Sequence, residues 1–272
     1  DEQKKAILLL SRGYVEVERY EDAERLLNLL VEKYPFDASV DEFHFLLSRT
    51  HLGRADIDAG VKEIAKIKEI NPRSGFINET HYYLALAMQR AGNLNRALEH
   101  LKTYVQLKNP EKHFEARLKL HEIYFEMGDY ANSKKTFDGL LNQYKARSDI
   151  DNIAFKAGLA YREKGVEYEK PFNFVVENNP ASDFSGEVCI IRGDDAFKDK
   201  NYALAEKWYK KFLSFPNREN AGPVFLYRLI STHCNAHTNT DPAWKVTRDT
   251  FEAVLAVYGR EQAAVDRGLS AT

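Results

Sequence analysis

The sequence has no long apolar run, few cysteines and almost no excess charge, and each absence excludes a class of protein. No stretch of about 18 consecutive apolar residues occurs, so we expect no transmembrane helix. Two cysteines, Cys189 and Cys234, are too few for a disulfide framework, and we expect both to be small buried residues. The net charge of −2 gives no reason to expect nucleic acid or an acidic membrane surface as the main partner.

The common motifs of catalysis are missing as well. The chain has no G-x-S-x-G, no Walker loop and no G-x-G-x-x-G. Residues 121–122 begin an H-E-x-x-H pattern, but Phe125 stands where the second histidine would be. His233 and His237 share a helix face with Cys234 between them, but no third ligand is evident, so we expect ordinary helix-end residues. We therefore predict no catalytic residue, no metal site and no cofactor.

What the sequence does contain is an internal repeat. The segment "AGNLNRALEHL" at 91–101 returns as "MGDYANSKKTF" at 127–137, and less closely as "DKNYALAEKWY" at 199–209. In the first copy Gly92 suits the end of one helix, and the small side chain of Ala97 allows close approach of the next. The pattern therefore predicts pairs of helices joined by a tight turn.

This pattern resembles the tetratricopeptide repeat, W-x2-L-G-x2-Y…A-x3-F…P, a helix–turn–helix unit of about 34 residues. The resemblance implies an all-α fold, a right-handed α-solenoid of about six to seven hairpins, since one hairpin cannot bury its apolar face alone. We predict six repeats in residues 1–216, with starts near residues 4, 41, 78, 114, 151 and 186. We expect a degenerate seventh hairpin at 217–259 and a C-terminal capping helix or tail at 260–272. The alternative is another helical-hairpin array with a slightly longer unit.

The resemblance also implies a binding surface, because the first helix of each tetratricopeptide hairpin lines a concave groove. The fifth position of every predicted unit is apolar, and neighbouring positions interleave aromatic and basic residues. The predicted groove residues are Arg12, Phe45, Arg49, Tyr82, Tyr83, Leu86, Arg90, Lys119, Phe125, Phe155, Arg162 and Phe197. Two interpretations stay open. Either these side chains pack between adjacent first helices, or they bind an extended or helical segment of another protein.

Two classes of partner are not expected in this groove. Tetratricopeptide co-chaperones that grip a chaperone C-terminal carboxylate use Lys at the fifth position and Asn at the ninth. Here no fifth position is Lys and no ninth position is Asn. Nucleic acid is disfavoured because the 39 basic residues are matched by 41 acidic ones.

We therefore predict a non-enzymatic scaffold that binds a protein or peptide ligand through its groove, with homo-oligomers possible. One alternative is a structural or self-assembling subunit of a bacterial envelope, secretion or export complex. The links "YPFDASVDEF" and "NPRSGFINET" resemble those of bacterial envelope tetratricopeptide proteins, such as the lipoprotein of the β-barrel assembly machinery. That resemblance implies the bacterial periplasm or envelope, with the cytoplasm as the alternative. A second alternative is the helical part of a larger enzyme.

Overall fold

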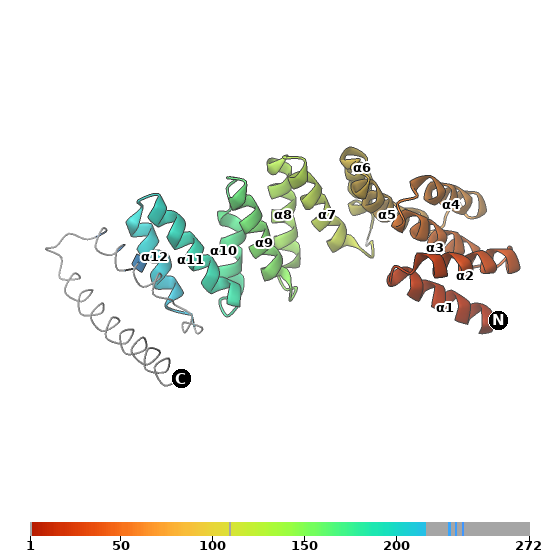
Figure 1. The fold of residues 1–272 in the computed structure, drawn as a ribbon, viewed down its shortest axis with the longest axis horizontal. Coiled ribbons are helices and arrows are strands. Elements are labelled where there is room, and N and C mark those ends of the chain that lie inside the picture. Colours follow the sequence, from red (N-terminus) through yellow and green to blue (C-terminus); the bar gives the residue numbers. More distant parts are fainter. Residues whose placement is uncertain (1, 109, 216–227, 230–231, 233–235, 237–272) are drawn as a thin grey trace, which may run out of the picture. The chain divides into compact units, whose positions relative to one another are not determined.

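The computed structural model describes residues 2–108 and 110–215, together with residues 228, 229, 232 and 236. Within these residues every regular element is an α-helix, and consecutive helices pair into six hairpins (Figure 1). The helices are α1 (Glu2–Glu16), α2 (Tyr20–Lys33), α3 (Val40–Gly53), α4 (Ile57–Ile70), α5 (Phe76–Arg90), α6 (Leu94–Val105), α7 (His113–Glu126), α8 (Tyr130–Tyr144), α9 (Ile150–Glu163), α10 (Glu169–Asn178), α11 (Asp183–Lys198) and α12 (Tyr202–Phe212).

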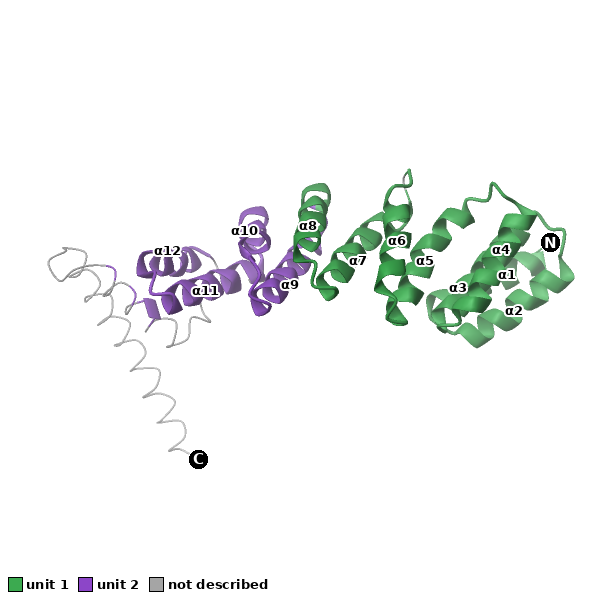
Figure 2. Cartoon of the chain, turned by 90° about the horizontal axis from the view of Figure 1, so that it is seen from above, with its two compact units in different colours: residues 1–144 green, residues 145–272 purple. Residues whose placement is uncertain are grey.

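The chain divides into two compact units, residues 1–144 and residues 145–272 (Figure 2). Unit 1 holds α1 to α8, and the described helices of unit 2 are α9 to α12. Within unit 1 the first helices α1, α3 and α5 touch in that order, while α2 packs on α3 and α4 packs on α5. Each hairpin therefore covers the apolar face of the next, as expected for stacked repeats.

The same turn closes all six described hairpins. One residue in each turn has the left-handed backbone conformation, with φ between 59° and 76°. These residues are Glu18, Ala55, Gly92, Gly128, Gly165 and Lys200. In every hairpin the next residue donates its N–H to the carbonyl five positions earlier, at 2.8–2.9 Å. This bond satisfies a helix-end carbonyl, so the turn residues provide a common register for the repeats.

Small residues permit close packing of the paired helices. A Cβ added at Gly193 of α11 would lie 2.3 Å from the ring of Tyr209 on α12. A Cβ at Gly158 of α9 would lie 2.4 Å from the ring of Phe172 on α10. A large ring on one helix thus fills the space that glycine leaves on the other.

The prediction of an all-α fold of about six helical hairpins is confirmed. None of the described helices is both long enough and apolar enough to cross a membrane. The seventh hairpin and the C-terminal cap fall almost entirely outside the described residues. The right-handed solenoid and the unit boundaries stay predictions.

Candidate functional site

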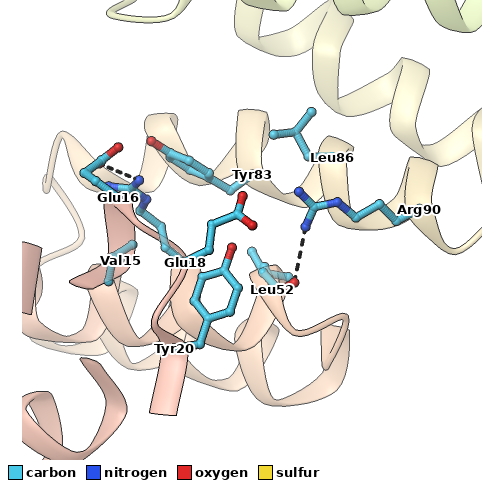
Figure 3. Close-up of a pocket in the computed structure, with 10 residues that line it drawn as sticks. Val15, Glu16, Glu18, Tyr20, Leu52, Tyr83, Leu86 and Arg90 are labelled. Atoms are coloured by element: carbon cyan, nitrogen blue, oxygen red, sulfur yellow. Dashed lines mark hydrogen bonds and ion pairs between the residues drawn. The ribbon is translucent and has the colours of Figure 1, made fainter. Parts of the chain in front are cut away.

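The candidate site is a pocket of about 140 Å³ in unit 1, formed where its first three hairpins meet (Figure 3). Its walls come from the end of α1, the α1–α2 turn, the start of α2, the C-terminal end of α3, and α5. The lining residues are Val15, Glu16, Glu18, Tyr20, Arg49, Leu52, Gly53, Tyr83, Leu86 and Arg90. Arg49, Tyr83, Leu86 and Arg90 belong to the predicted groove set, so the fold brings four of those twelve residues together.

Arg49 is a fixed cation in the wall of this pocket. Its Nη2 donates to Oε1 of Glu16 at 2.8 Å. Its guanidinium carbon lies 4.3 Å from the ring centroid of Tyr83 and 5.8 Å from that of Phe45. Ion pairing and cation–π attraction therefore act on the same group. Only 13% of the side chain is exposed, so Arg49 shapes the wall more than it offers a free charge.

Tyr83 forms the opposite side of that stack. Its ring also meets Phe45 edge-on, with centroids 5.8 Å apart. Burial raises the pKa of Tyr83 to about 12, against an opposing effect of the neighbouring Arg49. The phenol therefore keeps its proton at neutral pH and can both donate and accept hydrogen bonds.

Glu18 and Arg90 bring opposite charges to the mouth of the pocket, and both are exposed. Nη1 of Arg90 donates to the carbonyl of Gly53 at 3.2 Å, which holds the guanidinium close to α3. The Glu18 carboxylate and the Tyr20 hydroxyl point into the same space, with Arg90 across from them (Figure 3). One side of the mouth thus accepts hydrogen bonds and the other side donates them.

Three aromatic residues of the predicted groove set are buried. The exposed fractions of Phe45, Tyr82 and Phe155 are 7%, 8% and 6%. Phe45 stacks on Phe76 with centroids 4.8 Å apart, and Tyr82 packs against Tyr104 at 5.6 Å. Their burial favours the interpretation that they pack between neighbouring helices.

The other basic residues of the set are each held by a carboxylate. The pairs are Arg12–Glu42, Lys119–Glu122 and Arg162–Asp195, each with an N···O distance of 2.6 Å. In unit 2 the hydroxyl of Tyr168 also donates to Asp195 at 2.6 Å. Burial acts to raise the pKa of Asp195, but the hydrogen bonds from Arg162 and Tyr168 lower it overall. The Arg162 cluster therefore links α9 to α11 within unit 2.

Two half-buried phenylalanines complete the set. Phe125 lies edge-on to Tyr130 at 5.4 Å, and Phe197 lies edge-on to Tyr202 at 5.6 Å. Both tyrosines begin the second helix of the same hairpin. These contacts fix the hairpin turns of α7–α8 and α11–α12, and neither phenylalanine lines the pocket.

The predicted groove set lacks three lining residues, Glu16, Glu18 and Tyr20. Glu16 holds the same repeat position as Arg90, but it is acidic, and the predicted set contains only apolar, aromatic and basic residues. Glu18 and Tyr20 come after the first helix, so the groove positions of that helix do not include them.

A signal for Glu18 was present. It lies 37 residues before Ala55, and Ala55 lies 37 residues before Gly92, so Glu18 occupies the turn position where later hairpins use glycine. Glu18 and Lys200 are the two charged residues at this position, and three other described hairpins have glycine there.

The described residues include no group of three or more His, Cys, Asp or Glu arranged to hold a metal ion. His233, Cys234 and His237 lie outside the described residues. Cys189 is buried, as expected, and burial raises the pKa of its thiol to about 12. A thiol with so high a pKa is a poor nucleophile at neutral pH.

Comparisons with known proteins agree with the hairpin architecture. The tetratricopeptide repeat family matches residues 115–146, which cover nearly all of α7 and the whole of α8. No curated protein sequence matches the chain significantly.

Solved structures show the same fold at low sequence identity. The C-terminal part of a TPR repeat-containing protein from Cytophaga hutchinsonii is 15% identical, with 95% of this chain and 98% of that chain covered and a TM-score of 0.54. Kinesin light chain TPR-like repeats from Podosopora anserina are 14% identical, with 65% and 95% covered and a TM-score of 0.51. Identities this low show the fold alone.

Proposed function

We propose that this tetratricopeptide repeat protein is a non-enzymatic scaffold that binds a segment of another protein in the pocket of unit 1. The observation that carries the proposal is the pocket itself. Three successive hairpins combine there a fixed Arg49–Tyr83 stack, the half-buried Leu86, and the two exposed charges of Glu18 and Arg90. Aromatic and arginine side chains in a preformed hollow are typical anchors for a peptide.

The chemistry of the mouth suits the main chain of such a segment. Glu18 and Tyr20 can accept its N–H groups, while Arg90 can donate to its carbonyl oxygens. Leu86, which is half-buried, offers apolar contact to one of its side chains. Because Arg49 is already locked by Glu16 and Tyr83, little ordering of the scaffold would oppose binding.

The experiment places a photo-crosslinking amino acid at position 86 in the source cells and identifies the adducts by mass spectrometry. Leu86 is half-buried and lines the pocket, so the probe reaches a bound segment without replacing a core residue. We expect one dominant partner. Its yield should fall when Arg90→Glu reverses the charge at the mouth.

A probe at Lys62 on the exposed side of α4 is the matched control, because it belongs to unit 1 but does not line the pocket. The same adducts from both positions would mean that the pocket has no specific partner. If Arg90→Glu leaves the yield of adducts from position 86 unchanged, the charged side of the pocket does not take part in binding and the proposal fails.

A second candidate function, a self-assembling subunit of a bacterial envelope complex, has two observations in its favour. Helix α1 of the first hairpin exposes Leu9 and Leu10. The links between hairpins in this chain also resemble those of envelope tetratricopeptide proteins. Fractionation of the source cells would test the compartment, and recovery only in the cytoplasm would contradict this candidate.

A further inference from the structure

The pocket of unit 1 holds a carboxylate without a counter-charge. Glu18 is exposed at the mouth, and its side chain makes no hydrogen bond or ion pair with another described residue. The other lining carboxylate, that of Glu16, is already bound by Arg49. Arg19 follows Glu18 in the chain, but its guanidinium is bound to Asp22 and it does not line the pocket. Glu18 is therefore available to a ligand.

Three helices also end at this pocket. The last residues of α1, α3 and α5 are Glu16, Gly53 and Arg90, and all three line it. The C-terminal end of a helix carries a partial negative charge, so it favours a cation. Arg90 meets this preference at α3, where its Nη1 donates to the Gly53 carbonyl at 3.2 Å. The helix ends therefore add to the negative charge of Glu18 and favour a further cation beside it.

Two aromatic rings accompany Glu18 in the lining, those of Tyr20 and Tyr83. The Tyr20 ring is fixed against the end of α3, because a Cβ added at Gly53 would lie 2.3 Å from it. Its hydroxyl and the Glu18 carboxylate point into the same space (Figure 3). A carboxylate beside a phenol attracts an ammonium or guanidinium group, through charge-assisted hydrogen bonds and through the aromatic ring.

A neutral ligand would leave the charge of Glu18 uncompensated. Any segment that fills the pocket displaces water from this carboxylate, which is unfavourable unless a cation replaces the water. A main-chain N–H can use one lone pair of the carboxylate, but it brings no charge. Arg90 makes a weaker demand for an anion, because it already has a carbonyl partner and a guanidinium is weakly hydrated. Charge complementarity therefore selects a basic group.

We propose that the segment bound in this pocket carries a lysine or arginine whose charged end pairs with Glu18 and with the Tyr20 hydroxyl. The inference rests on the proposed function, that a protein segment occupies the pocket, and it names the residue type that anchors the segment. The aliphatic part of the anchor can contact the half-buried Leu86. Arg90 remains free to donate to carbonyl oxygens of the same segment.

The test uses a synthetic peptide that spans the segment crosslinked from position 86, and calorimetric titration measures its affinity for the whole chain. We expect Glu18→Gln to weaken binding about tenfold, because it removes the charge and keeps the size of the side chain. Tyr20→Phe should weaken binding about threefold, since only the hydroxyl is lost. Glu32→Gln is the matched control, because Glu32 is an exposed carboxylate on α2 that does not line the pocket. Circular dichroism checks that each variant stays helical.

Complementary changes in the peptide test the pairing itself. Each lysine or arginine of the peptide is replaced in turn by methionine, which keeps an unbranched chain without the charge. We expect one replacement to weaken binding to the parent about tenfold, and to have little further effect on binding to the Glu18→Gln variant. Additive losses would assign that basic residue to another contact and overturn the inference.

The outcomes separate this inference from the proposed function. A crosslinked segment without lysine or arginine, or equal affinities of the parent and Glu18→Gln, overturns the basic anchor and leaves the proposed function standing. Equal losses in Glu18→Gln and Glu32→Gln also overturn it, because they would report net charge alone. If no dominant partner crosslinks from position 86, the proposed function fails and the basic anchor fails with it.

Discussion

At position 193 only glycine fits, because the ring of Tyr209 occupies the place of a Cβ. Tyr209 is fully buried and its hydroxyl donates to Asp194 at 2.8 Å, so the ring has no free path away. We expect Gly193→Ala to destabilise the protein by about 1–3 kcal/mol, although alanine favours helices. Urea unfolding followed by circular dichroism measures the change.

Gly13→Ala is the control for that substitution. It is also a helix interior position, but nothing lies within 4 Å of the added Cβ. The free energy of unfolding should therefore rise by about 0.5–1 kcal/mol from helix propensity alone. Equal effects of the two substitutions would contradict the account of close packing.

At Glu18 the backbone conformation lowers stability, whereas the side chain belongs to the proposed binding site. Its φ of 59° is costly for an L-residue, whereas three other hairpins use glycine at the same place. We expect Glu18→Gly to raise the free energy of unfolding by up to about 1 kcal/mol, yet to lower crosslinking from position 86. Lys200→Gly is the matched control, because Lys200 has the same φ of 59° and lies in unit 2. Lys200→Gly should stabilise the protein without changing the crosslinks from position 86. A loss of crosslinks in both variants would contradict a binding role for Glu18.

At the scale of elements, the second and third hairpins differ in one pair of polar side chains between their two helices. His44 Nδ1 lies 2.6 Å from Oε2 of Glu63, between α3 and α4. The equivalent residues 37 positions later are His81 and His100, whose Nδ1 atoms are 2.9 Å apart, between α5 and α6. The centroids of these two rings are 5.1 Å apart, which fits a head-on N–H···N hydrogen bond. Such a bond needs one of the two imidazoles to be neutral.

The histidine pair gives the third hairpin a sensitivity to acid. Burial lowers the pKa of both histidines, with Lys68 adding to the effect on His81. Around His100, His81 and Arg96 lower the pKa further and Glu99 opposes them. The unfolded chain then binds protons more readily than the folded one. The stabilisation is therefore complete above pH ~6.5, and it is lost as the pH falls through the lowered pKa values.

His100→Glu converts this pair into the kind found in the second hairpin. We expect the variant to lose less free energy of unfolding than the parent between pH 7.5 and about 5.5, because His81 would then face a carboxylate. Urea unfolding at several pH values measures the difference. Burial also lowers the pKa of His121, but this contribution is common to both proteins and cancels in the comparison. If the free energy of unfolding depends on pH in the same way in both proteins, the acid sensitivity does not come from the His81–His100 pair.

At the scale of the whole molecule, unit 1 has its own hydrophobic core and its own pocket. Its core clusters and its pocket use residues within 1–144. We expect a fragment of residues 1–144 to be helical and to unfold cooperatively, because its hairpins stack on one another within unit 1. Circular dichroism measures this, and crosslinks from position 86 should be kept. A disordered fragment would show that unit 1 depends on unit 2.

The repeat could be read from the sequence because its signals are local. Gly92 and Gly128 occupy turns that need positive φ, and Gly193 permits a close helix pair, so residue type alone indicates the hairpins. The groove residues were harder to predict. Phe45 and Tyr82 match the groove pattern as well as Tyr83 does, but the first two are buried and Tyr83 reaches the pocket. A one-residue difference turns a helical side chain by about 100°, and only the neighbouring helices decide which direction is open.

The sequence by itself thus determined the all-α class, the hairpin period and the absence of common catalytic motifs, because these depend on residue type and spacing. Tertiary structure alone decided that Glu18, Arg49, Tyr83 and Arg90 meet in one pocket. It also showed that Leu9 and Leu10 are exposed, whereas Leu46 and Leu47, which lie 37 residues further on, are buried. Exposure and proximity depend on which helices stack on which, and the spacing of residues along one helix does not contain that information.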